Sequence, residues 1–328
     1  MRIGIIGCGR IGHVHGLSIK SIDAATVVAV SDPFEESAKR LAKVTDADIR
    51  VSDELIASDD VDAVIIATPT TTHYDLIHSA AKAGKAIFCE KPIDMDADRI
   101  RECIAVVDNH NVPFMTGLNR RFDKNFSTIQ QSIQNGDVGS VEILTILSRD
   151  PSPPPLDYVK TSGGLFRDMM IHDFDMARFL LGEELISVYA VGSVLVDPAI
   201  GEVGDVDTAA VTLKTATGKI CQISNSRRAT YGYDQRVEVH GSKGMLRAEN
   251  VLEHGVELAN GTGFTKAATE PFFLERYADA YVRELEHFID CVSAGKQPHP
   301  SAEDGLKAQL IADAAAKSLE TGQVIALT

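Results

Sequence analysis

The sequence predicts an α/β protein of two domains: a doubly wound parallel sheet, followed by an α+β domain with a large, mainly antiparallel sheet. The chain has 328 residues, which is longer than a domain with a single hydrophobic core usually is. Its first 118 residues alternate apolar runs with helical patterns, whereas later strands follow one another with turn signals between them. We therefore expect domains at residues 1–118 and 119–328.

Apolar runs rich in valine and isoleucine predict the strands of the first domain. Strands covered on both faces form nearly continuous hydrophobic stretches, and such stretches occupy residues 3–6, 26–30, 61–67, 86–89 and 112–115. Helical patterns lie between them at residues 35–43, 73–83 and 96–110. This alternation predicts a parallel sheet with helices on both faces.

The second domain has a different rhythm. Strand patterns occupy residues 141–148, 188–194, 209–215, 220–226, 236–240 and 256–259. Turn signals at 216–218 and 241–244 separate several of them, as antiparallel neighbours require. Helical patterns at 165–181, 275–294 and 302–319 flank the strands, so we expect helices segregated from a large sheet.

Composition excludes several classes of protein. The formal net charge of −15 argues against a nucleic-acid partner, because phosphate binding needs clustered Lys and Arg. No apolar run reaches the roughly 18–20 residues that a membrane span needs. The cysteines show no paired spacing, which argues against a disulfide framework or a zinc cluster and favours a reducing, cytoplasmic location. They are Cys8, Cys89, Cys103, Cys221 and Cys291.

A glycine-rich loop joins the first predicted strand to a helix. Gly7, Gly9 and Gly12 form a GxGxxG pattern that also contains Arg10 and Ile11. In a Rossmann fold the first glycine permits a tight turn, the second lets a pyrophosphate approach the backbone, and the third allows close helix–strand packing. The loop therefore predicts a dinucleotide site; the alternative is a purely structural glycine turn.

Asp32 ends the second predicted strand, 20 positions after Gly12. A carboxylate at this place accepts hydrogen bonds from ribose hydroxyls and repels a 2′-phosphate. No arginine stands beside it, and the nearest basic residues are Lys39 and Arg40. The expected cofactor is therefore NAD rather than NADP.

Two further segments follow strands of the first domain. Thr68 and Pro69 end the third of these strands, and Glu90, Lys91 and Pro92 end the fourth. Ligands bind at the carboxyl ends of strands in open α/β sheets, so these segments are candidates for the cofactor and substrate sites. Each also has a simpler interpretation: a polar turn before a helix, and a surface lysine before a proline.

In the second domain, Asp168 and His172 are four residues apart in the predicted helix over 165–181. That spacing places both side chains on one helical face. Histidine is suited to accept a hydroxyl proton near neutral pH, and a nearby carboxylate stabilises the imidazolium that forms. A surface Asp–His pair is the alternative, and a metal site is less favoured because no third ligand accompanies the pair.

The glycine loop, the Glu90–Lys91–Pro92 segment and the Gly163–Gly164, Asp168, His172 run occur in the order typical of the Gfo/Idh/MocA oxidoreductases, which the whole chain resembles. More narrowly, residues 162–180 and 231–239 resemble the inositol 2-dehydrogenases of that family.

The resemblance implies roles for matched positions. Lys91, Asp168 and His172 would be catalytic, with His172 as general base, Asp168 orienting it and Lys91 stabilising the reacting oxygen. Asn119, Arg121 and Phe122 would lie near the nicotinamide. The remaining substrate candidates are Arg121, Arg149, Asp150 and the loop residues Tyr231, Tyr233 and Asp234.

The resemblance implies NAD-dependent oxidation of a secondary hydroxyl of a cyclitol, with myo-inositol giving scyllo-inosose. One alternative is a dehydrogenase of scyllo-inositol or glucose, and another is a non-catalytic sensor of dinucleotide and sugar. The resemblance also implies a homo-tetramer, which agrees with a second sheet whose one face has no predicted covering helices.

Overall fold

The computed structural model describes residues 1–327 and divides into two compact units. The first contains Met1–Phe122 and Asp279–Gln309, and the second contains Asp123–Ala278 and residues 310–327. The prediction instead divided the chain once, at 118/119, because sequence order was the only guide. A segment from the C-terminal part of the chain therefore belongs to the N-terminal unit.

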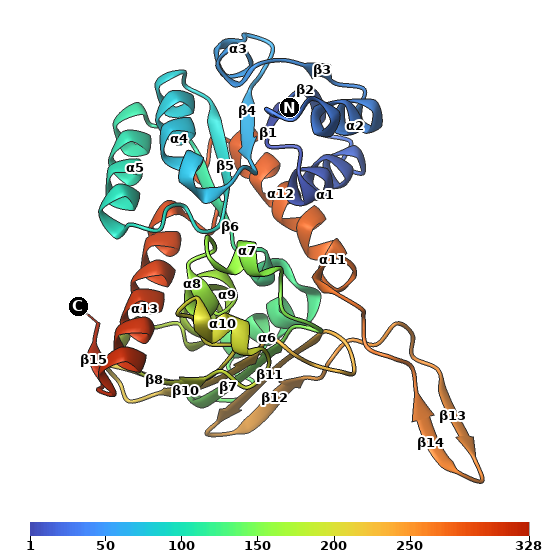
Figure 1. Cartoon of the computed structure of the whole chain (residues 1–328), viewed down its shortest axis with the longest axis vertical. Helices are drawn as coiled ribbons and strands as arrows, with labels where there is room; N and C mark the ends of the chain where they lie inside the picture. The colour runs from blue at the N-terminus through green and yellow to red at the C-terminus, as the bar shows by residue number, and fades with distance from the viewer. Residues whose placement is uncertain (328) are drawn as a thin grey trace. The chain divides into compact units, whose positions relative to one another are not determined.

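The first unit is built on a six-stranded parallel sheet of order β3-β2-β1-β4-β5-β6, so the predicted doubly wound sheet is confirmed (Figure 1). Its strands are β1 (Arg2–Ile6), β2 (Thr26–Ser31), β3 (Asp48–Ile49), β4 (Ala63–Ile66), β5 (Ala86–Glu90) and β6 (Phe114–Gly117). Edge strand β3 has only two residues, too few to show a sequence pattern. The strand order reverses between β1 and β4, where open α/β sheets bind ligands.

Helices cover both faces of this sheet, with α1 and α2 on one side and α4 and α5 on the other (Figure 1). The helical elements of this part of the chain are α1 (Arg10–Lys20), α2 (Glu35–Thr45), α3 (Ser52–Ala57), η1 (Thr70–Thr72), α4 (His73–Lys82), α5 (Ala97–His110), η2 (Asn119–Phe122) and α12 (Ala278–Ser293). Helix α12 contributes Leu285, Phe288 and Ile289 to the same buried core as β1, β2 and β5. Burial of this apolar stripe explains why α12 joins the first unit.

The second unit contains a seven-stranded sheet of order β12-β11-β7-β10-β9-β8-β15. Among the strand pairs of the described residues in this sheet, only β7 and β10 are parallel, so the prediction of a mainly antiparallel sheet is confirmed. Its strands are β7 (Val141–Arg149), β8 (Leu185–Ser193), β9 (Thr208–Thr215), β10 (Ile220–Ser226), β11 (Asp234–Gly241), β12 (Gly244–Ala248) and β15 (Ile325–Ala326). The strand predicted at 256–259 pairs elsewhere: β13 (Glu257–Asn260) and β14 (Gly263–Lys266) form a separate exposed hairpin.

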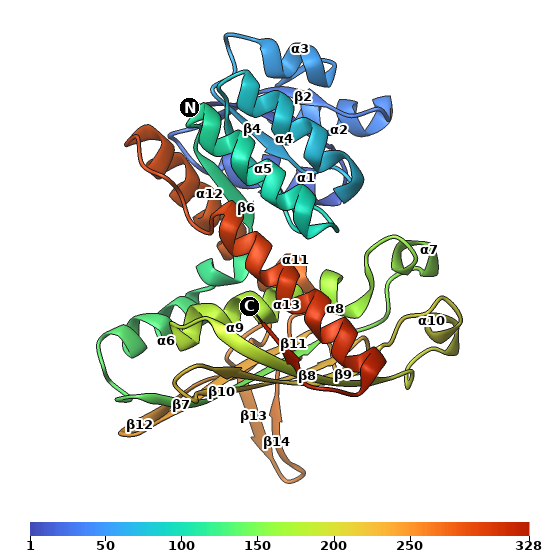
Figure 2. The same ribbon diagram turned by 90° about the vertical axis from the view of Figure 1, so that its left-hand side faces the viewer.

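Helices α6 and α9 pack on one face of this sheet (Figure 2). The remaining helices are α6 (Lys124–Gln134), α7 (Leu156–Val159), α8 (Gly164–Asp168), α9 (Ile171–Leu181), α10 (Pro198–Glu202), α11 (Phe273–Arg276) and α13 (Ala302–Thr321). Helix α6 was not predicted, although Asp123 caps it by accepting hydrogen bonds from the amides of Asn125 and Phe126. Across residues 1–327, no helix combines the length and apolar character of a membrane span.

The single helix predicted over 165–181 is wrong. Helix α8 ends at Asp168 and α9 begins at Ile171. The Leu165 carbonyl accepts hydrogen bonds from the amides of both Met169 and Met170, and this wide turn interrupts the regular ladder. Asp168 and His172 therefore lie on successive helices rather than on one face of a continuous helix.

Candidate active site

The glycine loop has the geometry that a dinucleotide requires. Gly7 has a φ of +98°, and a Cβ there would lie 2.5 Å from the Ala67 carbonyl oxygen. A Cβ on Gly12 would lie 1.9 Å from the Gly7 oxygen, whereas a Cβ on Gly9 would meet nothing within 4 Å. The first and third glycines are thus required by packing, and the second leaves open space at the start of α1.

The start of α1 also suits an anion. Gly9 precedes the helix and no side chain caps it among the described residues, so the first amides of α1 keep their donors. Arg10 is exposed and Ile11 is partly exposed at this end. Open space beside uncapped amides is the arrangement that a pyrophosphate fits, so the loop fits NAD.

Asp32 follows β2 and contacts the glycine loop directly. Its Oδ2 accepts a hydrogen bond from the amide of Cys8 at 2.7 Å, and its Oδ1 accepts one from the amide of Phe34 at 2.8 Å. A carboxylate has lone pairs left after two such bonds. Asp32 therefore orders the loop and keeps acceptor capacity for ribose hydroxyls.

A buried histidine connects two of the predicted segments. His73 contacts the Thr68 carbonyl oxygen at 2.9 Å and the Pro92 carbonyl oxygen at 3.0 Å. Burial lowers the pKa of His73, which favours the neutral imidazole. Pro69 is exposed beside Thr68, and the Lys91–Pro92 peptide bond is cis.

Glu90 is the last residue of β5, and Lys91 follows it directly. The amide of Lys91 donates a hydrogen bond to Glu90 Oε2 at 3.2 Å, while Glu90 Oε1 lies 2.7 Å from His15 Nε2. The side chain of Lys91 is partly exposed. Glu90 therefore holds the backbone at Lys91.

The predicted residues after β6 have different environments. Asn119 is buried, and Arg121 forms an ion pair with Asp304 in which Nη2 lies 3.0 Å from Oδ1. The ring centroid of Phe122 lies 5.4 Å from that of His287. These residues and the segments described above follow β1, β2, β4, β5 and β6, so the parallel sheet brings all the predicted site residues of the first unit to the carboxyl ends of its strands.

In the second unit, Asp168 has defined partners. Tyr158 donates its hydroxyl to Asp168 Oδ1 at 2.8 Å, and Arg227 Nη1 lies 3.4 Å from Asp168 Oδ2. Arg227 Nη2 also lies 3.8 Å from Asp205 Oδ2. Asp205 in turn accepts a hydrogen bond from the amide of Leu165, whose carbonyl accepts the amides at the break between α8 and α9.

His172 lies in the first turn of α9 and is partly exposed, whereas its neighbour Asp173 is buried. Asp173 accepts hydrogen bonds from Ser148 Oγ at 2.6 Å and from Asn225 Nδ2 at 2.9 Å. These bonds attach the start of α9 to strands β7 and β10, and so fix the backbone that carries His172.

The remaining predicted residues gather at one end of β7 and β11. Arg149 is the register partner of Asp234, and the amide of Asp150 donates to the Ser226 carbonyl. Tyr231 is exposed and donates its hydroxyl to Asp234 Oδ2 at 2.7 Å. Tyr233 is 4% exposed, with its ring against Phe272 and Tyr277.

Sequence reasoning did not find Arg227, Asp205 or Tyr158, the three side chains that contact or surround Asp168. They come from a strand end, a loop and a short helix separated along the chain, so no spacing connects them. The one local signal was Gly164, whose φ is +80° and whose Cβ would lie 2.7 Å from Asp205 Oδ1.

The family to which this fold and these residues belong is clear from comparison with known proteins. Residues 1–118 match the NAD-binding Rossmann fold of the Gfo/Idh/MocA oxidoreductase family, and residues 130–327 match the C-terminal alpha/beta domain of that family. The chain is therefore a member of the Gfo/Idh/MocA oxidoreductases, an NAD-binding enzyme family, and the resemblance seen in the sequence is confirmed.

Individual relatives are similar over their full length. The chain is 52% identical to the inositol 2-dehydrogenase of Rhizobium meliloti (strain 1021) over 327 residues, which cover 100% of this chain and 99% of that protein. A solved myo-inositol dehydrogenase from Corynebacterium glutamicum is 42% identical with a TM-score of 0.96, covering 100% and 99% of the two chains. Scyllo-inositol dehydrogenase from Lactobacillus casei, solved with NAD(H) and scyllo-inositol, is 31% identical with a TM-score of 0.93, covering 99% and 98%.

Proposed function

We propose that this chain is an NAD-dependent inositol dehydrogenase that oxidises the 2-hydroxyl of myo-inositol to give scyllo-inosose. The observation that carries the proposal is the 52% identity, across the whole chain, with an inositol 2-dehydrogenase. The glycine loop and Asp32 agree with it, because they provide a dinucleotide site with acceptors for an unphosphorylated ribose.

NAD, when bound, accepts the hydride that leaves the reacting carbon. The protein supplies orientation and proton transfer. We assign His172 as the base that accepts the hydroxyl proton at an imidazole nitrogen, with Asp168 stabilising the imidazolium that forms. Lys91 donates a hydrogen bond to the reacting oxygen and stabilises its developing negative charge.

The partners of these side chains support the roles. Asp168 receives a hydrogen bond from Tyr158 and lies beside Arg227, so its carboxylate is oriented before substrate arrives. The backbone of Lys91 is held by Glu90. Preorganised groups of this kind raise the rate because little rearrangement is needed during reaction.

Initial rates with a panel of polyols test the proposal. With NAD, myo-inositol should give the highest kcat/KM among myo-inositol, scyllo-inositol and glucose. Scyllo-inositol is the rival substrate, since the 31% identical Lactobacillus casei enzyme binds it. Absence of turnover of myo-inositol with NAD would sink the proposal.

His172→Ala separates an enzyme from a non-catalytic sensor. Loss of a general base typically lowers turnover by about 10²–10⁴-fold, while NADH binding should persist. NADH fluorescence and steady-state rates measure the two effects separately. A His172→Ala protein with unchanged turnover would contradict the assigned role.

We also propose that the chain works as a homo-tetramer in the cytoplasm. The open face of the seven-stranded sheet supports assembly, because it carries large exposed apolar side chains from neighbouring strands. They are Ile143, Tyr189, Val191 and Ile220. The cytoplasmic proposal rests on five cysteines that are all free thiols in the structure.

A further inference from the structure

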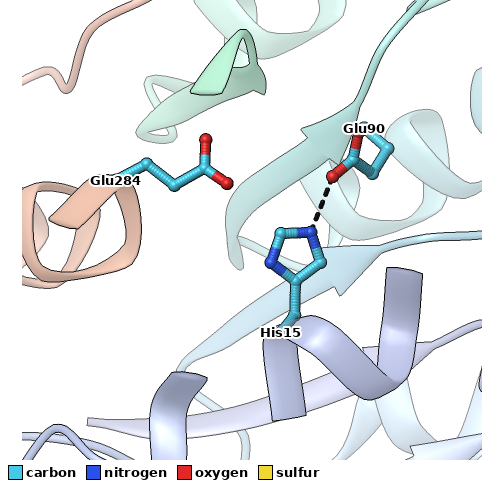
Figure 3. Close-up of side chains that lie close together, drawn as sticks. All are labelled: His15, Glu90 and Glu284. Atoms are coloured by element: carbon cyan, nitrogen blue, oxygen red, sulfur yellow. Dashed lines mark hydrogen bonds and ion pairs between the residues drawn. The ribbon is translucent and has the colours of Figure 1, made fainter. Parts of the chain in front are cut away.

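Three ionisable side chains meet inside the first unit. His15 comes from α1, Glu90 from the end of β5 and Glu284 from α12 (Figure 3). One ligand-type atom from each residue lies within 4.8 Å of the others. His15 and Glu284 are both 0% exposed, whereas the Glu90 side chain is 14% exposed, so most of the group is shielded from water.

Glu90 connects this group to Lys91. It accepts a hydrogen bond from the Lys91 amide on Oε2, and its Oε1 lies 2.7 Å from His15 Nε2. In the neutral tautomer of His15 that donates from Nε2 to the Glu90 carboxylate, Nδ1 is an acceptor. Glu90 also packs closely against Gly117, where a Cβ would lie 2.9 Å from Oε2.

The buried carboxyl group of Glu284 is unsatisfied among the described residues. Within the described chain, neither carboxylate oxygen of Glu284 has a hydrogen-bond partner, and His15 Nδ1 has none either. Figure 3 shows the Glu284 carboxyl group directed toward His15 and Glu90. A protonated Glu284 is a donor and His15 Nδ1 is an acceptor, so each supplies what the other lacks; a buried water can bridge them.

The charges around Glu284 favour the protonated form. His15 on α1 and Glu90 on β5 lie beside Glu284, and the ring of Tyr281 on α12 contacts His15. Burial, and then the negative charge of Glu90, raise the pKa of Glu284 well above its ordinary value.

A bound metal ion fits the group less well than a proton. Two atoms that ligate one zinc ion at about 2.0–2.2 Å stand roughly 3.3 Å apart in a tetrahedral site. His15 Nε2 and Glu90 Oε1 are 2.7 Å apart, which is a hydrogen bond.

We propose that Glu284 carries a proton that it directs at His15 Nδ1, and that the chain Glu284–His15–Glu90 thereby fixes the backbone of Lys91. Glu284 is then a positioning residue for the proposed catalytic lysine, acting through two side chains. This role rests on the proposed dehydrogenase function. It couples α12, from the C-terminal part of the chain, to the end of β5.

Two substitutions of Glu284 separate positioning from packing. Glu284→Gln keeps the shape and an N–H donor, so kcat should stay within about twofold of the wild type. Glu284→Met keeps a similar length but donates no hydrogen bond, so kcat should fall by about tenfold or more through misplacement of Lys91, with NADH affinity retained. The matched control is Glu286→Gln on the exposed side of α12, which should change neither value.

Stability against pH tests the proton independently of activity. A carboxyl whose pKa is raised in the folded state stabilises the fold fully below the ordinary glutamate pKa, and this stability is lost as pH rises through the raised pKa. Glu284→Gln cannot ionise, so its melting temperature should rise relative to that of the wild type as pH increases. Difference infrared spectra should show the carbonyl stretch of a protonated carboxylic acid in the wild type and not in Glu284→Gln.

Several results would overturn the proposal. If Glu284→Met has the wild-type kcat, Glu284 does not position Lys91. If the melting-temperature difference between the wild type and Glu284→Gln does not depend on pH, or if the carboxylic-acid band is absent, Glu284 does not carry a proton. One equivalent of zinc or manganese in the purified protein, released by a chelator with loss of stability, would assign the site to a metal. The stability and infrared results hold even if inositol is not turned over, so failure of the dehydrogenase proposal is distinguished.

Discussion

Arg227 is a buried residue that contacts the proposed catalytic residue Asp168. It is 1% exposed and lies beside two carboxylates, Asp168 and Asp205. Its Nε and Nη2 atoms have no hydrogen-bond partner among residues 1–327. A buried guanidinium compensates the negative charge of the carboxylates beside it. We therefore expect Arg227 to hold Asp168 in place.

Replacing Arg227 with Met should therefore affect both stability and turnover. Removing one partner of a buried ion pair typically destabilises a protein by about 3–5 kcal/mol, because the remaining charge is left uncompensated. Urea unfolding and steady-state rates measure the two effects. Arg228→Met is the control, since Arg228 is exposed and should change unfolding little. Unchanged stability and kcat in Arg227→Met would contradict the expected role.

Asp32 is the second residue with a specific consequence. Asp32→Ser replaces the two carboxylate oxygens that accept from the Cys8 and Phe34 amides with a single neutral hydroxyl, and it removes the charge that repels a 2′-phosphate. Loss of charged hydrogen bonds worth about 1.5–3 kcal/mol should lower kcat/KM for NAD by about 10–100-fold. The ratio of NADP to NAD use should rise. An unchanged cofactor ratio would show that Asp32 does not select the cofactor.

At the element scale, α12 shows how a helix can join a core far away in sequence. Its apolar stripe packs among residues of β1, β2 and β5, and Phe288 meets Phe88 edge-on with ring centroids 5.9 Å apart. The sequence shows that such a helix is amphipathic, because its apolar residues recur at helical spacing. It does not show which surface the stripe covers.

Phe288→Ala tests this packing. Truncating a fully buried phenylalanine typically destabilises a protein by about 3–5 kcal/mol through lost burial and the remaining cavity. Leu17→Ala is the control, because Leu17 is 54% exposed; it should change the free energy of unfolding by about 0.5 kcal/mol or less. If both variants unfold at the same urea concentration, α12 does not belong to this core.

The break between α8 and α9 belongs to the same scale. Sequence periodicity continues through residues 165–181, so a single helix was predicted there. The interruption arises because the Leu165 carbonyl accepts two amides, while Asp205 binds the Leu165 amide from another segment. Tertiary hydrogen bonds thus overrode a local preference.

At the scale of the whole molecule, the open sheet face is the feature that bears on assembly. Tyr189 and Val191 lie on β8 and are 41% and 47% exposed. Alternate residues of this strand are buried on the covered face, so the exposed pair belongs to the opposite face. Large apolar side chains on an uncovered sheet face are typical of an interface between subunits.

Charge placed on this face should disrupt a tetramer. We expect Tyr189→Lys combined with Val191→Lys to give a smaller species by light scattering, because lysines would be buried without partners at the interface. Leu17→Lys, an exposed apolar position on α1, is the control. A tetrameric mass for the double variant would contradict the proposed interface.

Features that depend on neighbours along the chain could be predicted from the sequence. Five of the six parallel strands of the first unit, the glycine loop and the acidic residue after the second strand were predicted, because each follows from local spacing of apolar residues, glycines and one carboxylate. The resemblance to the oxidoreductase family likewise followed from short motifs in a fixed order.

Contacts between residues far apart in the chain depend on how the chain folds, and the sequence does not show them. Arg227 beside Asp168, and Glu284 beside His15 and Glu90, join segments that no periodicity connects. These contacts affect protonation and stability because the groups are buried. An ionisable group removed from water must pair with another group or change its protonation state. That requirement depends on three-dimensional surroundings, and the order of residues along the chain does not contain it.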